Sequence, residues 1–242
     1  MFNHSLIILP TYNEALNIQL MIDKLFELYP KVSILVIDDN SPDKTSDLVE
    51  TIKNKHPNLF LITRSGKLGL GTAYLEGFQW ALSKKFEFIF QMDCDFSHDP
   101  KDLRNLMDDI INQNAHLAIG SRYSNNQVRT NGWSLHRLLL STFAAFTLRA
   151  ITGLKIRDSL GGFKCFKRDA LLGINLSNII SKGFVFQFEI NYKVSSKGFK
   201  IIETPIIFSE RIMGVSKMNI NIIFEAIVVI LKLRLLKISG RD

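Results

Sequence analysis

The first half of the chain alternates between short apolar runs and segments with helical spacing. Apolar runs rich in β-branched residues predict strands, and apolar residues at every third or fourth position predict helices. Strands that alternate with helices across short loops form a mostly parallel sheet covered on both faces. The sequence therefore predicts an α/β fold. The expected strands cover residues 5–10, 32–39, 59–63, 86–93 and 116–121, and the expected helices cover residues 13–29, 45–55, 72–84 and 99–112.

The pattern changes after about residue 121. Residues 133–152 predict a helix without acidic residues, and residues 158–171 predict a turn, a strand and the start of a helix. A further helix is expected over residues 182–198 and a last strand over residues 199–208. The second half therefore adds elements to the sheet but no longer alternates regularly.

The tail, residues 218–238, predicts an apolar helix that carries cationic side chains. Its uncharged stretch between Glu225 and Lys232 is short, whereas a bilayer span needs about 20 mostly apolar residues. We therefore expect no transmembrane helix. Two interpretations stay open for the tail: an amphipathic helix that lies on lipid, or a helix that closes the core.

The composition is that of a globular protein. The chain has 242 residues, of which 46% are hydrophobic and 22% charged, and this excludes a disordered or collagen-like chain. Only two cysteines occur, Cys94 and Cys165, so a disulfide framework is excluded and a reducing compartment is favoured. Residues 1–10 lack a basic stretch and a cleavage site, and we interpret them as the first strand rather than a signal peptide.

Charge is distributed unevenly along the chain. Residues 1–120 carry a net charge of −5 and residues 121–242 a net charge of +12. A basic half is typical of proteins that bind nucleic acid, phosphorylated substrates or anionic membranes, although it can also be a solvated face. Nucleic-acid binding would place aromatic side chains among the charges, but the phenylalanines lie within apolar patterns. No nucleic-acid partner is therefore expected.

Two carboxylates follow the fourth predicted strand. Asp93 and Asp95 flank Cys94, and residues two apart on a strand point to the same side. Open α/β sheets bind ligands at the carboxyl ends of their strands. Two adjacent carboxylates suit a hard divalent cation such as Mg²⁺ or Mn²⁺, with substrate phosphates completing the shell. The alternative is a solvated loop with capping carboxylates.

Other candidate groups lie at the same predicted edge. Asp38 and Asp39 end the second strand, where a carboxylate can accept hydrogen bonds from a ribose or a base, or can cap the next helix. Gly69 and Gly71 resemble part of a dinucleotide fingerprint, but Tyr74 occupies the third glycine position and the motif follows the wrong strand. Side chains suited to phosphate binding are Arg122, Arg137, Arg211 and Lys217. His98 and His116 are isolated, and we interpret neither as a ligand.

Several ordered segments together are similar to one family. They are residues 10–14 (PTYNE), 36–43 (VIDDNSPD), 67–74 (KLGLGTAY), 92–100 (MDCDFSHDP), 120–123 (GSRY), 182–187 (KGFVFQ) and 210–217 (ERIMGVSK). Their identity and order resemble the inverting family 2 glycosyltransferases, specifically the dolichol- or polyprenyl-phosphate mannosyltransferases. The resemblance covers about residues 5–218. It implies a GT-A fold, a divalent metal, and transfer of mannose from GDP-mannose to dolichyl or polyprenyl phosphate.

The resemblance also implies roles for particular residues. The nucleotide pocket would be lined by Pro10, Tyr12, Glu14, Ile37 and Asp39. The metal on the donor diphosphate would be held by Asp93 and Asp95, with the Cys94 backbone alongside, and the diphosphate would be contacted by Arg211 and Lys217. The acceptor phosphate would face Arg122, Arg137 and Ser141. Asp95, Arg122 and Arg211 would thus be the residues most directly involved in catalysis.

The resemblance has departures and leaves alternatives. Cys94 and Asn40 stand where relatives commonly have alanine and glycine. Ser97 stands where some relatives have a metal-binding glutamine, so ligation by Ser97 is not implied. The base and the sugar cannot be derived from the sequence, so a UDP-sugar donor with the same acceptor remains an alternative. The more distant alternative is a non-enzymatic module that binds nucleotides or nucleic acid.

The resemblance finally implies an organisation and a location. Residues 1–217 would be the catalytic domain, with a nucleotide-binding half (1–120) and an acceptor-binding half (121–217) that includes an interfacial helix at 133–152. Residues 218–242 would form a helix that associates with the membrane. We expect a cytoplasmic protein bound peripherally to the cytoplasmic face of a membrane, through these helices or through a membrane-anchored partner subunit.

Overall fold

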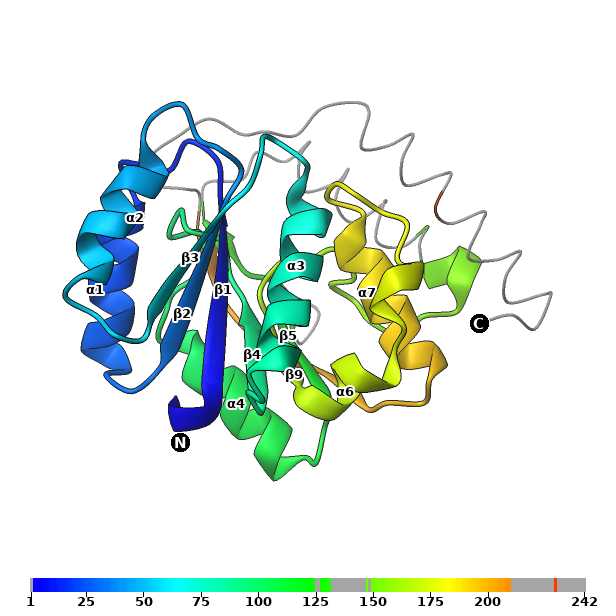
Figure 1. The fold of residues 1–242 in the computed structure, drawn as a ribbon. Coiled ribbons are helices and arrows are strands. Elements are labelled where there is room, and N and C mark those ends of the chain that lie inside the picture. The colour runs from blue at the N-terminus through cyan, green and yellow to red at the C-terminus, as the bar shows by residue number, and fades with distance from the viewer. Residues whose placement is uncertain (1, 125–126, 132–146, 148, 210–228, 230–242) are drawn as a thin grey trace.

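The computed structural model describes residues 2–124, 127–131, 147, 149–209 and 229. Within them a seven-stranded sheet has helices on both faces (Figure 1). Its strand order is β10-β5-β9-β4-β1-β2-β3. The strands are β1 (Ser5–Thr11), β2 (Ser33–Asp38), β3 (Leu59–Thr63), β4 (Phe88–Gln91), β5 (Leu117–Ser121), β9 (Lys164–Lys167) and β10 (Ile201–Pro205).

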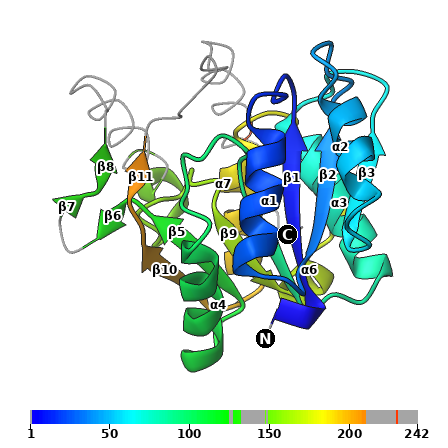
Figure 2. The ribbon, with the colours of Figure 1, turned by 90° about the vertical axis from the view of Figure 1, so that its left-hand side faces the viewer.

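Helices cover the two faces of this sheet, as the two perpendicular views show (Figures 1 and 2), and an apolar layer lies between the helices and each face. Side chains of α1, α2 and α4 pack on one face, and side chains of α3, α6 and α7 pack on the other. The strands are buried on both faces, which explains their nearly continuous apolar runs. The helices are α1 (Ile18–Leu28), α2 (Thr45–Lys53), α3 (Leu70–Ser83), α4 (Asp102–Asn112), α6 (Arg168–Gly173) and α7 (Phe186–Ser196).

Strand β9 is the antiparallel member of the described sheet. It lies between β4 and β5 and pairs with both in the antiparallel direction, whereas the other neighbouring strands are parallel. The sequence predicted a strand within residues 158–171 but not this central place. Because β9 runs the opposite way, its first residue, Lys164, lies at the edge where the parallel strands end. One sheet thus contains strands from both halves of the chain.

Smaller elements complete the described chain. Two-stranded sheets join β6 (Tyr123–Ser124) to β7 (Gln127–Val128), and β8 (Thr130–Asn131) to β11 (Phe208–Ser209). Short 3-10 helices cover Phe2–His4 and Leu176–Asn178. The expected helix at 133–152 lies largely outside the described residues, and the tail lies outside them except for the buried Val229.

Candidate active site

The carboxyl ends of the parallel strands meet at one edge of the sheet. β1 ends at Thr11, β2 at Asp38 and β4 at Gln91. Of the predicted donor-site residues that the structure describes, Pro10 and Ile37 are next to last in their strands, and the others lie in the loops that follow: Tyr12, Glu14, Asp39, Asp93, Cys94 and Asp95. The order of the strands, with β1 between β2 and β4, brings the three loops together. This edge is the place where open α/β sheets bind ligands.

Asp93 and Asp95 lie in the loop after β4, not on the strand. The ladder ends at Gln91, and Met92 N still donates to Ile8 O of β1 at 3.3 Å. The alternation of side chains along a strand therefore does not determine the directions of these two side chains. Asp95 is buried, with 5% exposure, and its Oδ1 accepts a hydrogen bond from Ser97 N at 3.0 Å. Asp93 is half-buried, and Cys94 between them is a buried cysteine that forms no disulfide bond.

The donor chemistry of this loop fits a hard cation. Among the described residues, no group of three or more His, Cys, Asp or Glu side chains could hold a metal. Two carboxylates alone suit Mg²⁺ or Mn²⁺, because these ions retain waters and bind substrate phosphates. The residues present therefore fit a cation that completes its shell with a diphosphate.

Asp39 shapes the loop beside the expected nucleotide pocket. Its Oδ1 accepts from Arg64 Nη1 at 2.6 Å, and its Oδ2 accepts from the backbone N–H groups of Leu68 and Gly69 at 3.1 and 3.2 Å. Both carboxylate oxygens thus already have partners within the chain. The sequence did not single out Arg64, because its partner lies 25 positions away. A hydrogen bond from Asp39 to a nucleotide stays a prediction.

Asp38 has a structural role. It is fully buried and accepts hydrogen bonds from Thr11 Oγ1, Ser41 N and Ser41 Oγ. These bonds join the end of β1 to the loop before α2. The structure therefore favours the second interpretation of this carboxylate, a local anchor ahead of a helix.

The remaining predicted nucleotide residues surround the ends of β1 and β2. Lys67 Nζ lies 4.3 Å from the centre of the Tyr12 ring, so a cation covers this aromatic face. The Glu14 carboxylate accepts from Asn17 Nδ2 at 2.9 Å. Pro10 is half-buried, whereas Ile37 is fully buried beneath α3. Their contacts with a nucleotide stay predictions.

On the other side of the sheet edge, Arg122 is paired with Asp158. Arg122 Nε and Nη2 donate to the two Asp158 oxygens at 2.7 and 2.6 Å, and Arg122 N donates to the same carboxylate at 2.9 Å. Burial alone would lower the pKa of Arg122, but the Asp158 charge outweighs it and raises the pKa above its ordinary value. The guanidinium is therefore held charged in one orientation.

Asp158 is itself held in place from β10. The backbone N–H groups of Arg157 and Asp158 donate to the Glu203 carboxylate at 2.9 and 2.8 Å, and Ser121 Oγ donates to it at 2.8 Å. Sequence reasoning missed Asp158 and Glu203, although both are acidic residues within a strongly basic half. Their negative charge within a basic region was the signal in the sequence that could have marked them.

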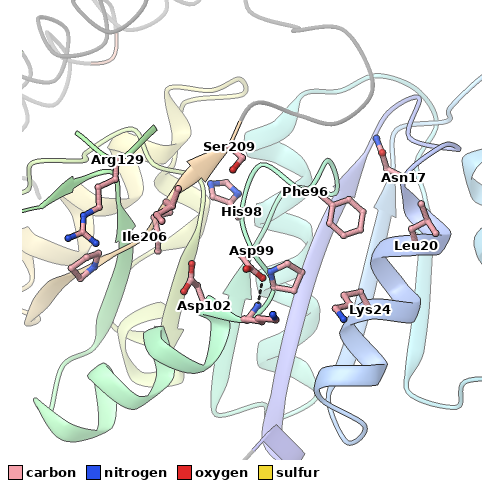
Figure 3. A pocket seen from close by; sticks show the side chains of 14 residues that line it. Asn17, Leu20, Lys24, Phe96, His98, Asp99, Asp102, Arg129, Ile206 and Ser209 are labelled. Carbon is pink, nitrogen blue, oxygen red and sulfur yellow. Dashed lines mark hydrogen bonds between the residues drawn. The ribbon is translucent and has the colours of Figure 1, made fainter. Parts of the chain in front are cut away.

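His98 lies within reach of the charges of Asp95 and of the Arg122–Asp158 pair. It is buried, stacks on Phe163 with ring centres 4.9 Å apart, and lines a cavity (Figure 3). Burial lowers its pKa to about 4, even though the charge of Asp95 acts in the opposite direction. The histidine is therefore neutral at pH 7. The sequence interpretation of His98 as an isolated residue missed this position.

The cavity in Figure 3 lies beside the predicted donor site rather than in it. It has a volume of about 1020 Å³ and is lined by α1, the 96–102 segment and the region from Pro205 to Ser209. None of the predicted site residues that the structure describes lines it. The predicted residues Arg137, Ser141, Arg211 and Lys217 lie outside the described residues.

Comparison with known proteins identifies the family. Residues 6–174 match the family Glycosyl transferase family 2. The chain is 40% identical over 223 residues to the polyprenol monophosphomannose synthase of Mycolicibacterium smegmatis, which covers 92% of this chain and 83% of that protein. The chain belongs to glycosyl transferase family 2. It is also 36% identical over 223 residues to the undecaprenyl-phosphate mannosyltransferase of Micrococcus luteus, covering 92% and 90% of the two chains.

Solved structures confirm the fold of this family 2 glycosyltransferase. A glucosyl-3-phosphoglycerate synthase of Mycobacterium tuberculosis matches with a TM-score of 0.65 at 16% identity, over 94% of this chain and 79% of that one. A mannosyltransferase of Pyrobaculum calidifontis, solved with GDP-Man and Mn²⁺, matches with a TM-score of 0.61 at 20% identity, over 99% and 64%. The predicted GT-A fold is confirmed. Within the described parts of this glycosyltransferase, no helix is both long and apolar enough to span a bilayer.

Proposed function

We propose that this glycosyltransferase transfers mannose from GDP-mannose to a polyprenyl phosphate and forms polyprenyl phosphate β-mannose. The observation that carries the proposal is the similarity, over 92% of the chain, to two relatives named for mannose transfer to polyprenyl phosphates. The described site supports the proposal: the carboxylates Asp93 and Asp95 follow β4, and the charged Arg122 follows β5 at the same edge of the sheet. A non-enzymatic module is not favoured, since the family is one of enzymes.

Asp93 and Asp95 would hold Mg²⁺ or Mn²⁺ against the donor diphosphate. The bound cation would neutralise the negative charge that develops on GDP as it departs. The hydrogen bond from Ser97 N orients Asp95 for this role. Ser97 itself is buried, and nothing in its described contacts makes it a ligand.

The acceptor needs positioning rather than activation. A phosphate monoester has a second pKa of about 6, so it is already an anionic nucleophile at neutral pH. His98 is neutral and buried, and no general base is required. Asp158 holds the Arg122 guanidinium in a fixed orientation, so that Arg122 can meet the acceptor phosphate without reorganisation. In-line attack on the anomeric carbon would invert the α-linked donor into a β-linked product.

Membrane contact belongs to the same proposal. A polyprenyl chain is insoluble in water, so the acceptor phosphate is presented at a lipid surface. The basic half of the chain carries the charge that an anionic surface attracts. Residues 133–152 and 218–242 are the segments that we propose to lie against lipid, with or without an anchoring partner.

The test is transfer of radiolabelled mannose in detergent. Purified enzyme is incubated with GDP-mannose, Mn²⁺ or Mg²⁺, and polyprenyl phosphate, and label is measured in the organic phase. We expect label to move only when both metal and acceptor are present. Transfer from UDP-glucose or UDP-N-acetylglucosamine, but not from GDP-mannose, would overturn the donor and leave the acceptor chemistry intact.

A further inference from the structure

A cluster of fully buried polar side chains lies beneath the end of β4, on the face covered by α3 and α7. It consists of Tyr74 on α3, Gln91 on β4, Lys164 on β9 and Gln187 on α7. The antiparallel register places Lys164 directly opposite Gln91, two residues before Asp93. Burying polar groups in a core costs free energy unless they are hydrogen-bonded, so the partners of each group have to be identified.

Lys164 fixes the orientation of the Gln187 side chain. Lys164 Nζ donates to the backbone O and to Oε1 of Gln187, both at 2.8 Å. Gln91 Nε2 also donates to Gln187 Oε1, at 3.4 Å, so two donors face the amide oxygen of Gln187 and its amide nitrogen faces away. In the described part of the chain, no carboxylate lies within ion-pair distance of Lys164. Burial lowers the pKa of this lysine well below its ordinary value.

The Gln187 nitrogen faces a small space next to Asp93. Gln187 Nε2 is buried and has no hydrogen-bond partner among the described residues. A Cβ atom added at Gly162 would lie 3.4 Å from Gln187 Nε2 and 3.6 Å from Asp93 Oδ2. The absence of a side chain at Gly162 therefore leaves room for one small group between an amide donor and a carboxylate acceptor.

A hydroxyl group complements both borders of this space. Its oxygen can accept from Gln187 Nε2 while its proton is donated to the Asp93 carboxylate. Buried donors in proteins almost always have a partner, so a donor left unpaired next to a substrate-binding carboxylate indicates that the partner arrives with the substrate. The donor carries such hydroxyls on its ribose and on the transferred sugar. Gly162 comes just before β9, on the side of β4 away from β1 and β2, where the nucleotide is expected, so the transferred sugar is the part that fits.

We infer that Gln187 binds one hydroxyl group of the transferred sugar in the space beside Gly162, and that Lys164 positions Gln187 for this contact. The inference rests on the proposed function, because it takes Asp93 to face the sugar nucleotide. A site that hydrogen-bonds a substrate hydroxyl rejects analogues that lack it. Gln187 is therefore a determinant of sugar specificity, distinct from the groups that hold the diphosphate.

The first experiment fills the space with a methyl group. The added carbon of Gly162→Ala makes only ordinary van der Waals contacts, so we expect the fold to be retained. Thermal unfolding of the variant checks this. The matched control is Gly66→Ala, where an added Cβ meets nothing within 4 Å. We expect Gly162→Ala to lower kcat/KM for GDP-mannose roughly ten- to hundredfold, the effect of one lost substrate hydrogen bond, with GDP affinity unchanged. Wild-type kinetics in Gly162→Ala would overturn the inference.

The second experiment identifies the hydroxyl. Gln187→Glu keeps an oxygen for Lys164 but removes the N–H donor. Wild-type enzyme and this variant are compared on GDP-mannose and on analogues that each lack one sugar hydroxyl. We expect the wild type to reject one analogue roughly ten- to hundredfold, and Gln187→Glu to lose that discrimination alone. Equal loss on every donor would mean a purely structural role and would overturn the inference.

Failure of the proposed function gives a different result. In that case the wild type transfers no mannose from GDP-mannose, and a panel of nucleotide sugars identifies the true donor. The same two variants are then assayed with deoxy analogues of that sugar. Loss of discrimination for one hydroxyl would support the role of Gln187, and its absence would overturn it.

Discussion

At the scale of single residues, His98 makes stability depend on pH. Its pKa is lowered from 6.5 to about 4 by burial. Below pH 6.5 the unfolded chain therefore binds a proton at His98 that the folded protein does not bind until about pH 4. As the pH decreases from 6.5 to 4, the free energy of unfolding therefore decreases. A shift of this size corresponds to roughly 3 kcal/mol.

His98→Phe keeps an aromatic ring against Phe163 and removes the titration. We expect urea unfolding to give pH-independent differences between variant and wild type above pH 7. As the pH falls from 6.5 toward 4, the variant should gain up to about 3 kcal/mol relative to wild type. Parallel stability curves over the whole range would show that His98 titrates normally in the folded protein.

Residues differ in how far sequence could predict their roles. Asp93 and Asp95 form a local pattern after an apolar strand, so their place at the sheet edge was predictable. Arg64, Asp158 and Gln187 gain their roles from partners in other elements. No local pattern marks such a residue, because the fold decides which side chain it meets.

At the scale of elements, two glycines at the start of α3, Gly69 just before it and Gly71 in its first turn, allow a close approach of chain segments. Gly69 has φ +104°, and a Cβ at Gly71 would lie 2.7 Å from Phe186 Cβ and 2.8 Å from Ser181 O. Gly71 N also donates to Lys182 O at 2.8 Å. The pattern that resembled a dinucleotide fingerprint thus packs the start of α3 against the 181–186 segment.

Gly71→Ala should therefore destabilise the protein. Backbone and Cβ atoms cannot yield as the end of a flexible side chain can, and overpacking typically costs about 1–3 kcal/mol. We expect this loss in urea unfolding, while Gly66→Ala stays within about 0.5 kcal/mol of wild type. If both variants unfold alike, the contact with Ser181 and Phe186 is looser than described.

The order and type of the strands and helices in the first half were predicted correctly because their periodicity is local, although some ends differ: the helix expected from residue 13 begins at Ile18, and the strand expected over 86–93 covers Phe88–Gln91. The place of β9 between β4 and β5 was not predictable, since it depends on pairing between segments 45 to 79 positions apart. That strand nevertheless brings Gly162 and Lys164 under the Asp93 loop. The element that periodicity located least well is thus the one that completes the site.

At the scale of the whole molecule, donor binding should be visible as thermal stabilisation. A ligand that binds only the folded state at a hundredfold excess over its Kd adds about 2.7 kcal/mol. For a protein of this size, 1 kcal/mol shifts Tm by roughly 2–4 °C. We therefore expect GDP with Mn²⁺ to raise Tm by roughly 5–10 °C, and UDP at the same concentration to raise it less.

The variant Asp95→Asn tests the cation site in this measurement without changing the stability of the unliganded protein. The asparagine can still accept the hydrogen bond from Ser97 N, so Tm without ligand should stay close to that of wild type. Its lost negative charge should weaken the cation site, so that adding Mn²⁺ no longer increases the shift given by GDP. Wild-type protein in EDTA should behave in the same way as the variant. A Mn²⁺-dependent shift that persists in Asp95→Asn would place the cation away from this loop and would remove the electrostatic argument for how GDP departs.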